Sequence, residues 1–141
     1  MGKIWLFCFL FLVWPVFAQS PLRPGSNTDG ELAAKLIGTW RFHDPDSSSD
    51  TTFSKDGTAR GTIEYYDEQG NSTFQVDFIS EWKVENGQLV ARIVESNKPD
   101  RLPIGAQSSD TILSVSDYRF VFLAGDLRVK KVMVRNPPVV G

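Results

Sequence analysis

Cysteine, histidine and an excess of charge of either sign are what this chain has least of. Its 141 residues include one cysteine, Cys8, and one histidine, His43. Lys and Arg number 15 against 17 Asp and Glu, a formal net charge of −2. The sequence has no run of basic residues that would predict nucleic acid or anionic lipid as a partner. One cysteine cannot form a disulfide within the chain, so the apolar core alone must stabilise the fold.

Long apolar runs are also scarce, and the one that is present lies at the N-terminus. It follows Lys3, covers residues 4–14, and is shorter than the roughly 20 residues that a membrane-spanning helix needs. Val16 and Ala18 supply small residues at positions −3 and −1 of a signal-peptide cleavage site. We therefore expect residues 1–18 to be removed on export. Gln19 would then begin a periplasmic or secreted protein without a stable membrane anchor, and an uncleaved N-terminal anchor is the alternative.

The rest of the chain divides into three parts. Residues 19–27 are rich in Pro, Gly and Ser and are predicted to be a flexible linker. Residues 28–136 have the length of one folded domain, and residues 137–141 form a C-terminal tail. No internal repeat or second domain is visible.

A short helix is predicted at the start of this domain. Thr28 and Glu31 have the spacing of a capping box, in which each side chain accepts from a free backbone N–H of the first turn. Leu32 and Leu36 give the helix one apolar edge, and Gly38 ends it. With about two turns, the helix needs to pack on other elements to be stable.

From Thr39 onward the apolar pattern has a period of two, which is typical of β-strands with one buried and one solvated face. The clearest example alternates from Thr73 to Glu85. The pattern predicts eight strands with no helix between them, at residues 39–43, 50–54, 58–67, 73–85, 88–96, 110–115, 117–124 and 126–135.

The last predicted strand changes its apolar parity part-way. Leu127 and Val129 have one parity, and Val132 and Val134 have the other. An extra residue in one strand of a pair shifts the facing of every later side chain. We therefore predict a β-bulge near Lys130-Lys131.

The connections alternate between tight and loose. Residues 54–57, 86–87 and 116–117 are tight turns, and Asn-Gly at 86–87 is the strongest short hairpin signal. The longer connections include 44–49 and 97–109. In an up-and-down barrel alternate turns lie at opposite ends, so one end is predicted to be closed and the other to be an open mouth, with 97–109 as its lid.

Several motifs resemble those of the lipocalin superfamily of calycins, and in particular short bacterial lipocalin-like domains. These motifs are Gly38-Thr39-Trp40 after a short helix, Ser116-Asp117-Tyr118 before the seventh strand and Arg135 at the end of the eighth. Phe53 through Thr58 also resembles the Phe-x-x-Asp-Gly-Thr hairpin of the short domains. The resemblance covers residues 30–136. It implies an all-β, eight-stranded antiparallel up-and-down barrel with a short N-terminal helix, in which the arginine packs over the Trp ring.

The same topology places the ends of the first, seventh and eighth strands together at the closed end. We expect a structural cluster there, and not a catalytic site. Its predicted members are Gly38, Trp40, Asp117, Tyr118 and Arg135.

Catalytic and metal sites have little support in the sequence. His43 lies near Asp44, Asp46 and Asp50, an arrangement that divalent metals accept. The same residues also form an ordinary polar turn, which we favour. No Ser lies in a Gly-x-Ser-x-Gly context. We predict no catalytic residue, no metal and no cofactor, and hence no enzyme. An enzyme that uses His43 is the weakest alternative.

The barrel interior is predicted to be aromatic, with Phe42, Phe74, Phe78 and Phe122 as the wall of a ligand site. The same aromatics would also suit a barrel packed solid. The leading hypothesis, which follows the family resemblance, is an exported, non-catalytic protein that binds a small apolar or amphipathic ligand. The alternative is a filled barrel that acts on an exported protein partner, for example as an inhibitor with 19–27 as an inserting arm.

Overall fold

The computed structural model describes residues 27–125 and 129–136. The predicted signal peptide, nearly all of the predicted linker and the tail lie outside the described residues. Within the described residues, no helix has the length and apolar character needed to cross a membrane.

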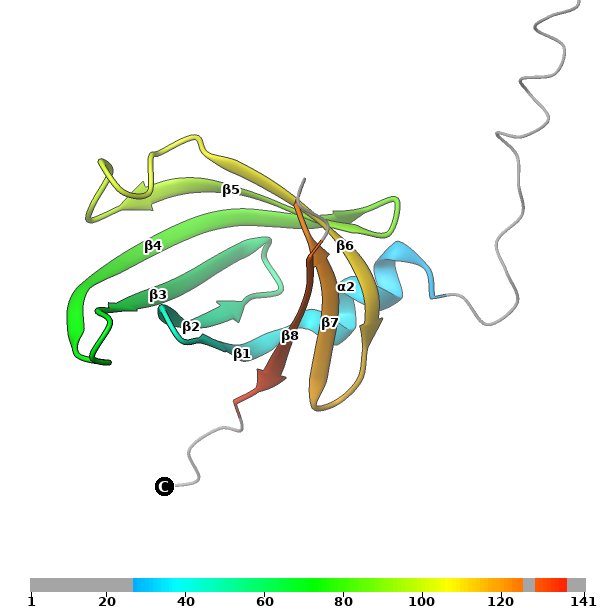
Figure 1. Ribbon diagram of the computed structural model, residues 1–141. Helices are drawn as coiled ribbons and strands as arrows, with labels where there is room; N and C mark the ends of the chain where they lie inside the picture. Colours follow the sequence, from blue (N-terminus) through cyan, green and yellow to red (C-terminus); the bar gives the residue numbers. More distant parts are fainter. Residues whose placement is uncertain (1–26, 126–128, 137–141) are drawn as a thin grey trace, which may run out of the picture.

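The described chain is a closed antiparallel barrel with one short helix at its N-terminal side (Figure 1). Each strand pairs with its neighbour in sequence, and β1 closes the ring by pairing with β8. The predicted eight-stranded up-and-down barrel is therefore confirmed. The elements are α2 (Asp29–Leu36), β1 (Gly38–Asp44), β2 (Ser47–Phe53), β3 (Thr58–Tyr66), β4 (Ser72–Glu85), β5 (Gln88–Ser96), β6 (Gln107–Val115), β7 (Arg119–Ala124) and β8 (Val129–Arg135).

Local signals at the start of the domain act as predicted. The Thr28 hydroxyl accepts a hydrogen bond from the Glu31 N–H at 3.2 Å, and the Glu31 carboxylate accepts one from the Thr28 N–H at 3.1 Å. The Asp29 carboxylate accepts hydrogen bonds from the backbone N–H groups of Asn86 and Gly87, at 2.8 and 2.9 Å. These contacts fix the N-terminus of α2 to the tight β4–β5 turn.

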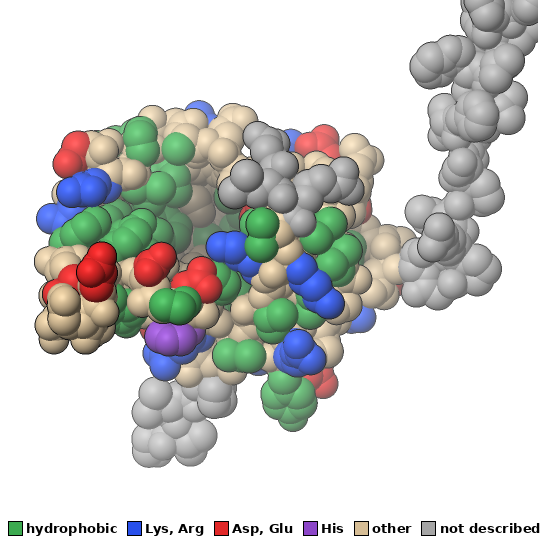
Figure 2. Space-filling view, in the orientation of Figure 1, with side chains coloured by type: hydrophobic (Ala, Val, Ile, Leu, Met, Phe, Trp, Pro, Cys, Tyr) green, Lys and Arg blue, Asp and Glu red, His purple; other side chains and the backbone are tan. Residues whose placement is uncertain are grey.

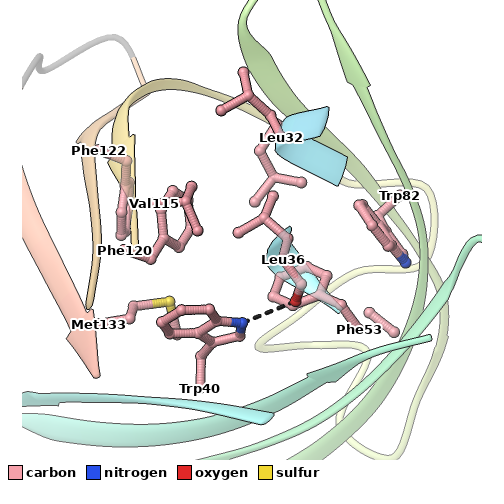
Figure 3. Packing of buried hydrophobic residues seen from close by; sticks show 11 residues of the cluster. Leu32, Leu36, Trp40, Phe53, Trp82, Val115, Phe120, Phe122 and Met133 are labelled. Atoms are coloured by element: carbon pink, nitrogen blue, oxygen red, sulfur yellow. Dashed lines mark hydrogen bonds between the residues drawn. The ribbon is translucent and has the colours of Figure 1, made fainter. Parts of the chain in front are cut away.

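The helix fills one half of the barrel. Leu36 is fully buried and Leu32 is 7% exposed, and both belong to one apolar cluster with inward side chains of the strands. Figure 3 shows this cluster, with the Trp40 indole N–H directed at the Leu36 carbonyl oxygen. The strand members of the cluster are Trp40, Phe53, Ala59, Trp82, Leu89, Val115, Phe120, Phe122 and Met133.

The predicted bulge near Lys130 is wrong. The β7–β8 register runs without a shift from Arg119 opposite Val134 to Ala124 opposite Val129. The apolar parity changes because Lys131 faces the barrel interior while Val132 faces outward. Side chains alternate regularly along β8. What is unusual is that a lysine stands at an inward position and a valine at the outward position next to it.

The predicted loop 44–49 is also shorter than expected. Ser47, Ser48 and Ser49 belong to β2 and pair with β1, which leaves only Pro45 and Asp46 in the turn. Serine has a weak strand preference, and here the ladder of hydrogen bonds to β1 overrides it. The connection 97–106 is the long one at the mouth, since β6 begins at Gln107.

Candidate functional site

The mouth half of the barrel is lined by apolar side chains that solvent still reaches. These side chains face inward, because each has the same parity as a buried neighbour in its strand, yet each is only partly buried. In Figure 2 hydrophobic side chains cover a broad, hollowed area on the left of the molecule. The inward, partly buried residues of this half are Phe42, Ile63, Tyr65, Phe74, Phe78 and Ile93. The barrel is therefore filled at the closed end, whereas most inward side chains of the mouth half stay partly exposed; Val76, between Phe74 and Phe78, is fully buried.

One wall of the mouth is built from stacked aromatic rings. Tyr65 of β3 lies opposite Phe74 of β4, and their rings stack with centroids 4.6 Å apart. Arg101, from the long connection 97–106, places its guanidinium carbon 4.7 Å from the Phe74 ring centroid. The connection thus reaches the mouth. That a lid forms there stays a prediction.

Phe78 packs deeper on the same wall. It lies opposite Gly61 of β3, and a Cβ at Gly61 would overlap the Phe78 ring. Glycine at this position leaves room for the far end of the Phe78 ring against β3. Phe122, the fourth predicted wall residue, is 9% exposed and stacks on Phe120 at 4.7 Å. It belongs to the filled half, whereas the other three predicted wall residues border the open half.

The opposite wall contains a charged group that the sequence analysis did not predict. The ammonium of Lys131 lies 4.8 Å from the Phe42 ring centroid and 3.7 Å from an Asp44 carboxylate oxygen. It bridges the seam between β1 and β8, where only Trp40 with Arg135 and Arg41 with Val134 are paired. A cavity of about 510 Å³ opens along this seam, lined by Phe42, His43, Asp44, Ala124, Val129, Lys130, Lys131 and Val132.

Asp110 is a further charged group on the inner wall, besides Lys131 and Asp44. It pairs with the buried Leu89, so its side chain faces inward, and one carboxylate oxygen accepts a hydrogen bond from the Gly125 N–H at 2.9 Å. Burial raises the pKa of the Asp110 carboxyl, because desolvation penalises the charged form; the Gly125 hydrogen bond and the Lys131 charge oppose this shift.

The raised pKa gives Asp110 a defined pH signature. The folded chain holds this proton more tightly than the unfolded chain. The group's contribution to stability is therefore lost as the pH rises from the ordinary carboxyl pKa of 3.8 through the higher folded pKa. Asp110→Asn keeps an oxygen acceptor for Gly125. We expect it to match the wild type in acid and to be more stable at neutral pH, because asparagine carries no charge to desolvate. Denaturant unfolding of both proteins across this pH range checks it, and a difference that does not change with pH would contradict the prediction.

The closed end is organised by Arg135. Its guanidinium carbon lies 4.3 Å from the Trp40 ring centroid, and its nitrogens donate to the carbonyl oxygens of Asp117, Ile37 and Lys35 at 2.6, 2.9 and 2.8 Å. One side chain thus joins the end of β8 to the helix, to β1 and to the β6–β7 turn. Gly38 has φ of +126°, and a Cβ there would overlap Arg135 Nη1.

The other two residues predicted for this cluster take part through the backbone. Asp117 contributes its carbonyl oxygen, and the Tyr118 carbonyl accepts from the Arg135 N–H at 2.9 Å. The Tyr118 side chain is 75% exposed and lies outside the cluster. Three features close this end of the barrel. They are the helix α2, the Gly-x-Trp at the start of β1, and Arg135 of β8, which lies over that Trp ring. The fold is lipocalin-like.

Comparisons with known proteins found similarity among solved structures alone. No protein-family model matches the chain, and no curated protein matches it in sequence. A lipocalin-like protein from Bacteroides uniformis ATCC 8492 is 13% identical, over 72% of this chain and 99% of that one, with a TM-score of 0.47. An uncharacterized protein from Bacteroides eggerthii DSM 20697 is 12% identical with the same coverage and a TM-score of 0.44. Bovine odorant binding protein, in complex with a selenium-containing odorant, is 15% identical over 83% of this chain and 78% of its own, with a TM-score of 0.43.

His43 faces the outside of the lipocalin-like barrel. Its ring lies 6.4 Å from the Tyr66 ring, and Asp50 is held by Arg41 through two hydrogen bonds of 2.8 and 2.9 Å. Asp44, in contrast, faces the interior and meets Lys131. Across residues 27–125 and 129–136, no three His, Cys, Asp or Glu side chains gather as metal ligands would.

The charged residues on the inner wall had one signal in the sequence. The apolar residues of the last strand change parity near Lys131. Because the β7–β8 register is regular, this change means that Lys131 faces inward. Asp110 carried no such signal, because it stands at the edge of a predicted strand among serines.

Proposed function

We propose that this protein is an exported, non-catalytic carrier that holds a small apolar or amphipathic ligand in the mouth of its barrel. The observation that supports the proposal is the division of the interior. Helix α2 and the buried apolar cluster that contains Trp40 fill the closed half. In the other half, inward aromatic and aliphatic side chains remain partly exposed to solvent. A concave apolar surface with a few polar groups at its rim suits a ligand of this kind.

The rim adds polar groups to this apolar surface. Lys131 and Arg101 each lie over an aromatic ring at the mouth, and Asp44 and Asp110 face the same interior. Burial of the ligand's apolar surface would supply the affinity, at about 25 cal/mol per Å² before the costs of association. The alternative function assumed a filled barrel, and the open half therefore favours the carrier.

Binding of 11-(dansylamino)undecanoic acid, followed by fluorescence, tests the proposal. Phe42→Ser and Phe74→Ser remove apolar surface from opposite walls, and we expect each to weaken binding about tenfold. Both residues are half-buried, so the barrel should still fold. Gln75→Ser, outward on the same strand as Phe74, is the matched control and should leave the affinity within about twofold.

Two results would overturn this carrier proposal. One is a wild-type protein that binds no probe and that shows no extra mass by native mass spectrometry after purification from its own compartment. The other is equal probe binding by the two Phe variants and the control. Export is tested separately, since cleavage after Ala18 would give a protein that begins with Gln19.

A further inference from the structure

The outer surface of β7 and β8 has a composition unlike that of the other strand pairs. Facing alternates along both strands, and the regular register brings the outward side chains into three facing pairs. These are Arg119 with Val134, Val121 with Val132, and Leu123 with Lys130. We call these six residues the β7–β8 outer face.

Four of the six side chains are aliphatic, although this side of a barrel wall meets water. Val134 is 48% exposed, and the adjoining strand and turn add Leu113 at 48% and Tyr118 at 75%. The outer surface of β3 and β4 is polar in contrast, with Thr62 hydrogen-bonded to Asp77 across the pair. Exposed apolar patches of this kind usually mark a surface that binds another protein or a membrane.

The charges on this face have one sign. Its two ionisable residues, Arg119 and Lys130, are both cationic and stand at opposite corners of the array. Arg41, beside Val134 on β1, is already neutralised by Asp50. In Figure 2, hydrophobic and basic side chains are seen over β7 and β8. An apolar centre with cationic corners is complementary to an anionic, partly apolar surface.

We propose that the β7–β8 outer face docks on a lipid surface that carries anionic headgroups. The aliphatic side chains enter the headgroup region, and Arg119 and Lys130 pair with the lipid phosphates. A second copy of this chain fits less well, because face-to-face pairing would bring cations toward cations. The face borders the β1–β8 seam, where backbone pairing stops and Lys131 bridges the strands. Docking would thus bring the seam cavity to the lipid.

Co-sedimentation with vesicles tests this docking surface. The protein is the chain from Gln19, because residues 4–14 would enter a bilayer by themselves. The vesicles contain equal parts of phosphatidylcholine and phosphatidylglycerol, and pure phosphatidylcholine vesicles serve as the reference. We expect binding to the mixed vesicles at low ionic strength, weakened by salt. Arg119→Gln with Lys130→Gln should lower the affinity about fivefold for each cation removed.

Matched variants separate this surface from general charge effects. Lys83→Gln with Arg92→Gln removes the same charge from the outer surface of β4 and β5, and it should change vesicle binding by less than about twofold. Val132→Ser should weaken binding several-fold without altering charge. The absence of wild-type binding to mixed vesicles would overturn the proposal, as would an equal loss in the β4–β5 control. A dimer that the Val132 variant dissociates would assign the face to a second copy instead. None of these outcomes depends on the carrier function.

Discussion

Replacing Trp40 with alanine is expected to lower the free energy of unfolding by about 3–5 kcal/mol. Trp40 is fully buried at the point where α2, β1 and β7 meet. Its indole N–H donates to the Leu36 carbonyl oxygen at 2.8 Å, and its ring meets the Phe120 ring edge-on with centroids 6.1 Å apart. Alanine would leave a cavity and an unpaired carbonyl, and it would also remove the surface on which Arg135 rests.

Trp40→Phe separates the ring from its hydrogen bond. It retains most of the apolar contact but leaves the Leu36 carbonyl without its indole donor, and we expect a loss of about 1–3 kcal/mol. Denaturant unfolding of the three proteins checks both values. If Trp40→Ala and Trp40→Phe were equally unstable, the hydrogen bond and not the packing would dominate, which would contradict the argument from the cavity.

Replacing Arg135 with glutamine is expected to lower the free energy of unfolding by about 2–4 kcal/mol. The substitution removes the cation from the Trp40 ring and leaves the carbonyls of Lys35, Ile37 and Asp117 without their donor. These carbonyls belong to two segments, the C-terminal end of α2 and the β6–β7 turn, so losing their shared donor loosens the connection between them. Arg119→Gln, on the outer face, removes the same charge without those contacts and should change stability by less than about 0.5 kcal/mol.

Gly38→Ala provides a second test of the same arrangement. In the wild type the added Cβ overlaps Arg135 Nη1, and the positive φ of Gly38 adds backbone strain. In the Arg135→Gln background the overlap is largely removed and the strain remains. We therefore expect the Gly38→Ala penalty to be smaller in that background by a measurable coupling free energy. Additive penalties would show that the two residues act independently.

The elements of the barrel could be predicted because their signals are local. Strand alternation, the Thr28 capping box and the Asn86-Gly87 turn each depend on neighbouring residues only. Gly38, Trp40 and Arg135 could be brought together from topology, since a meander returns alternate strand ends to the same end of the barrel. The Tyr118 side chain could not be placed this way, because a turn residue may face solvent whatever its backbone does.

The predictions that failed required knowledge of the register. The parity change in the last strand had two readings, a bulge or an inward lysine, and local sequence does not choose between them. The regular pairing of β7 with β8 selects the inward Lys131. The same register turns Val132 and Val134 outward and so creates the β7–β8 outer face, which appears in the sequence only as two valines with the wrong parity.

The sequence by itself determined the fold class, the strand order and the closed end, because apolar periodicity and turn chemistry are properties of short segments. Only the tertiary structure decided how much of the barrel is filled, and with what. That outcome depends on where Leu32 and Leu36 of α2 enter the barrel and on how far they reach. The packing of a helix against distant strands is a non-local balance of volumes, and no single segment of the chain encodes it.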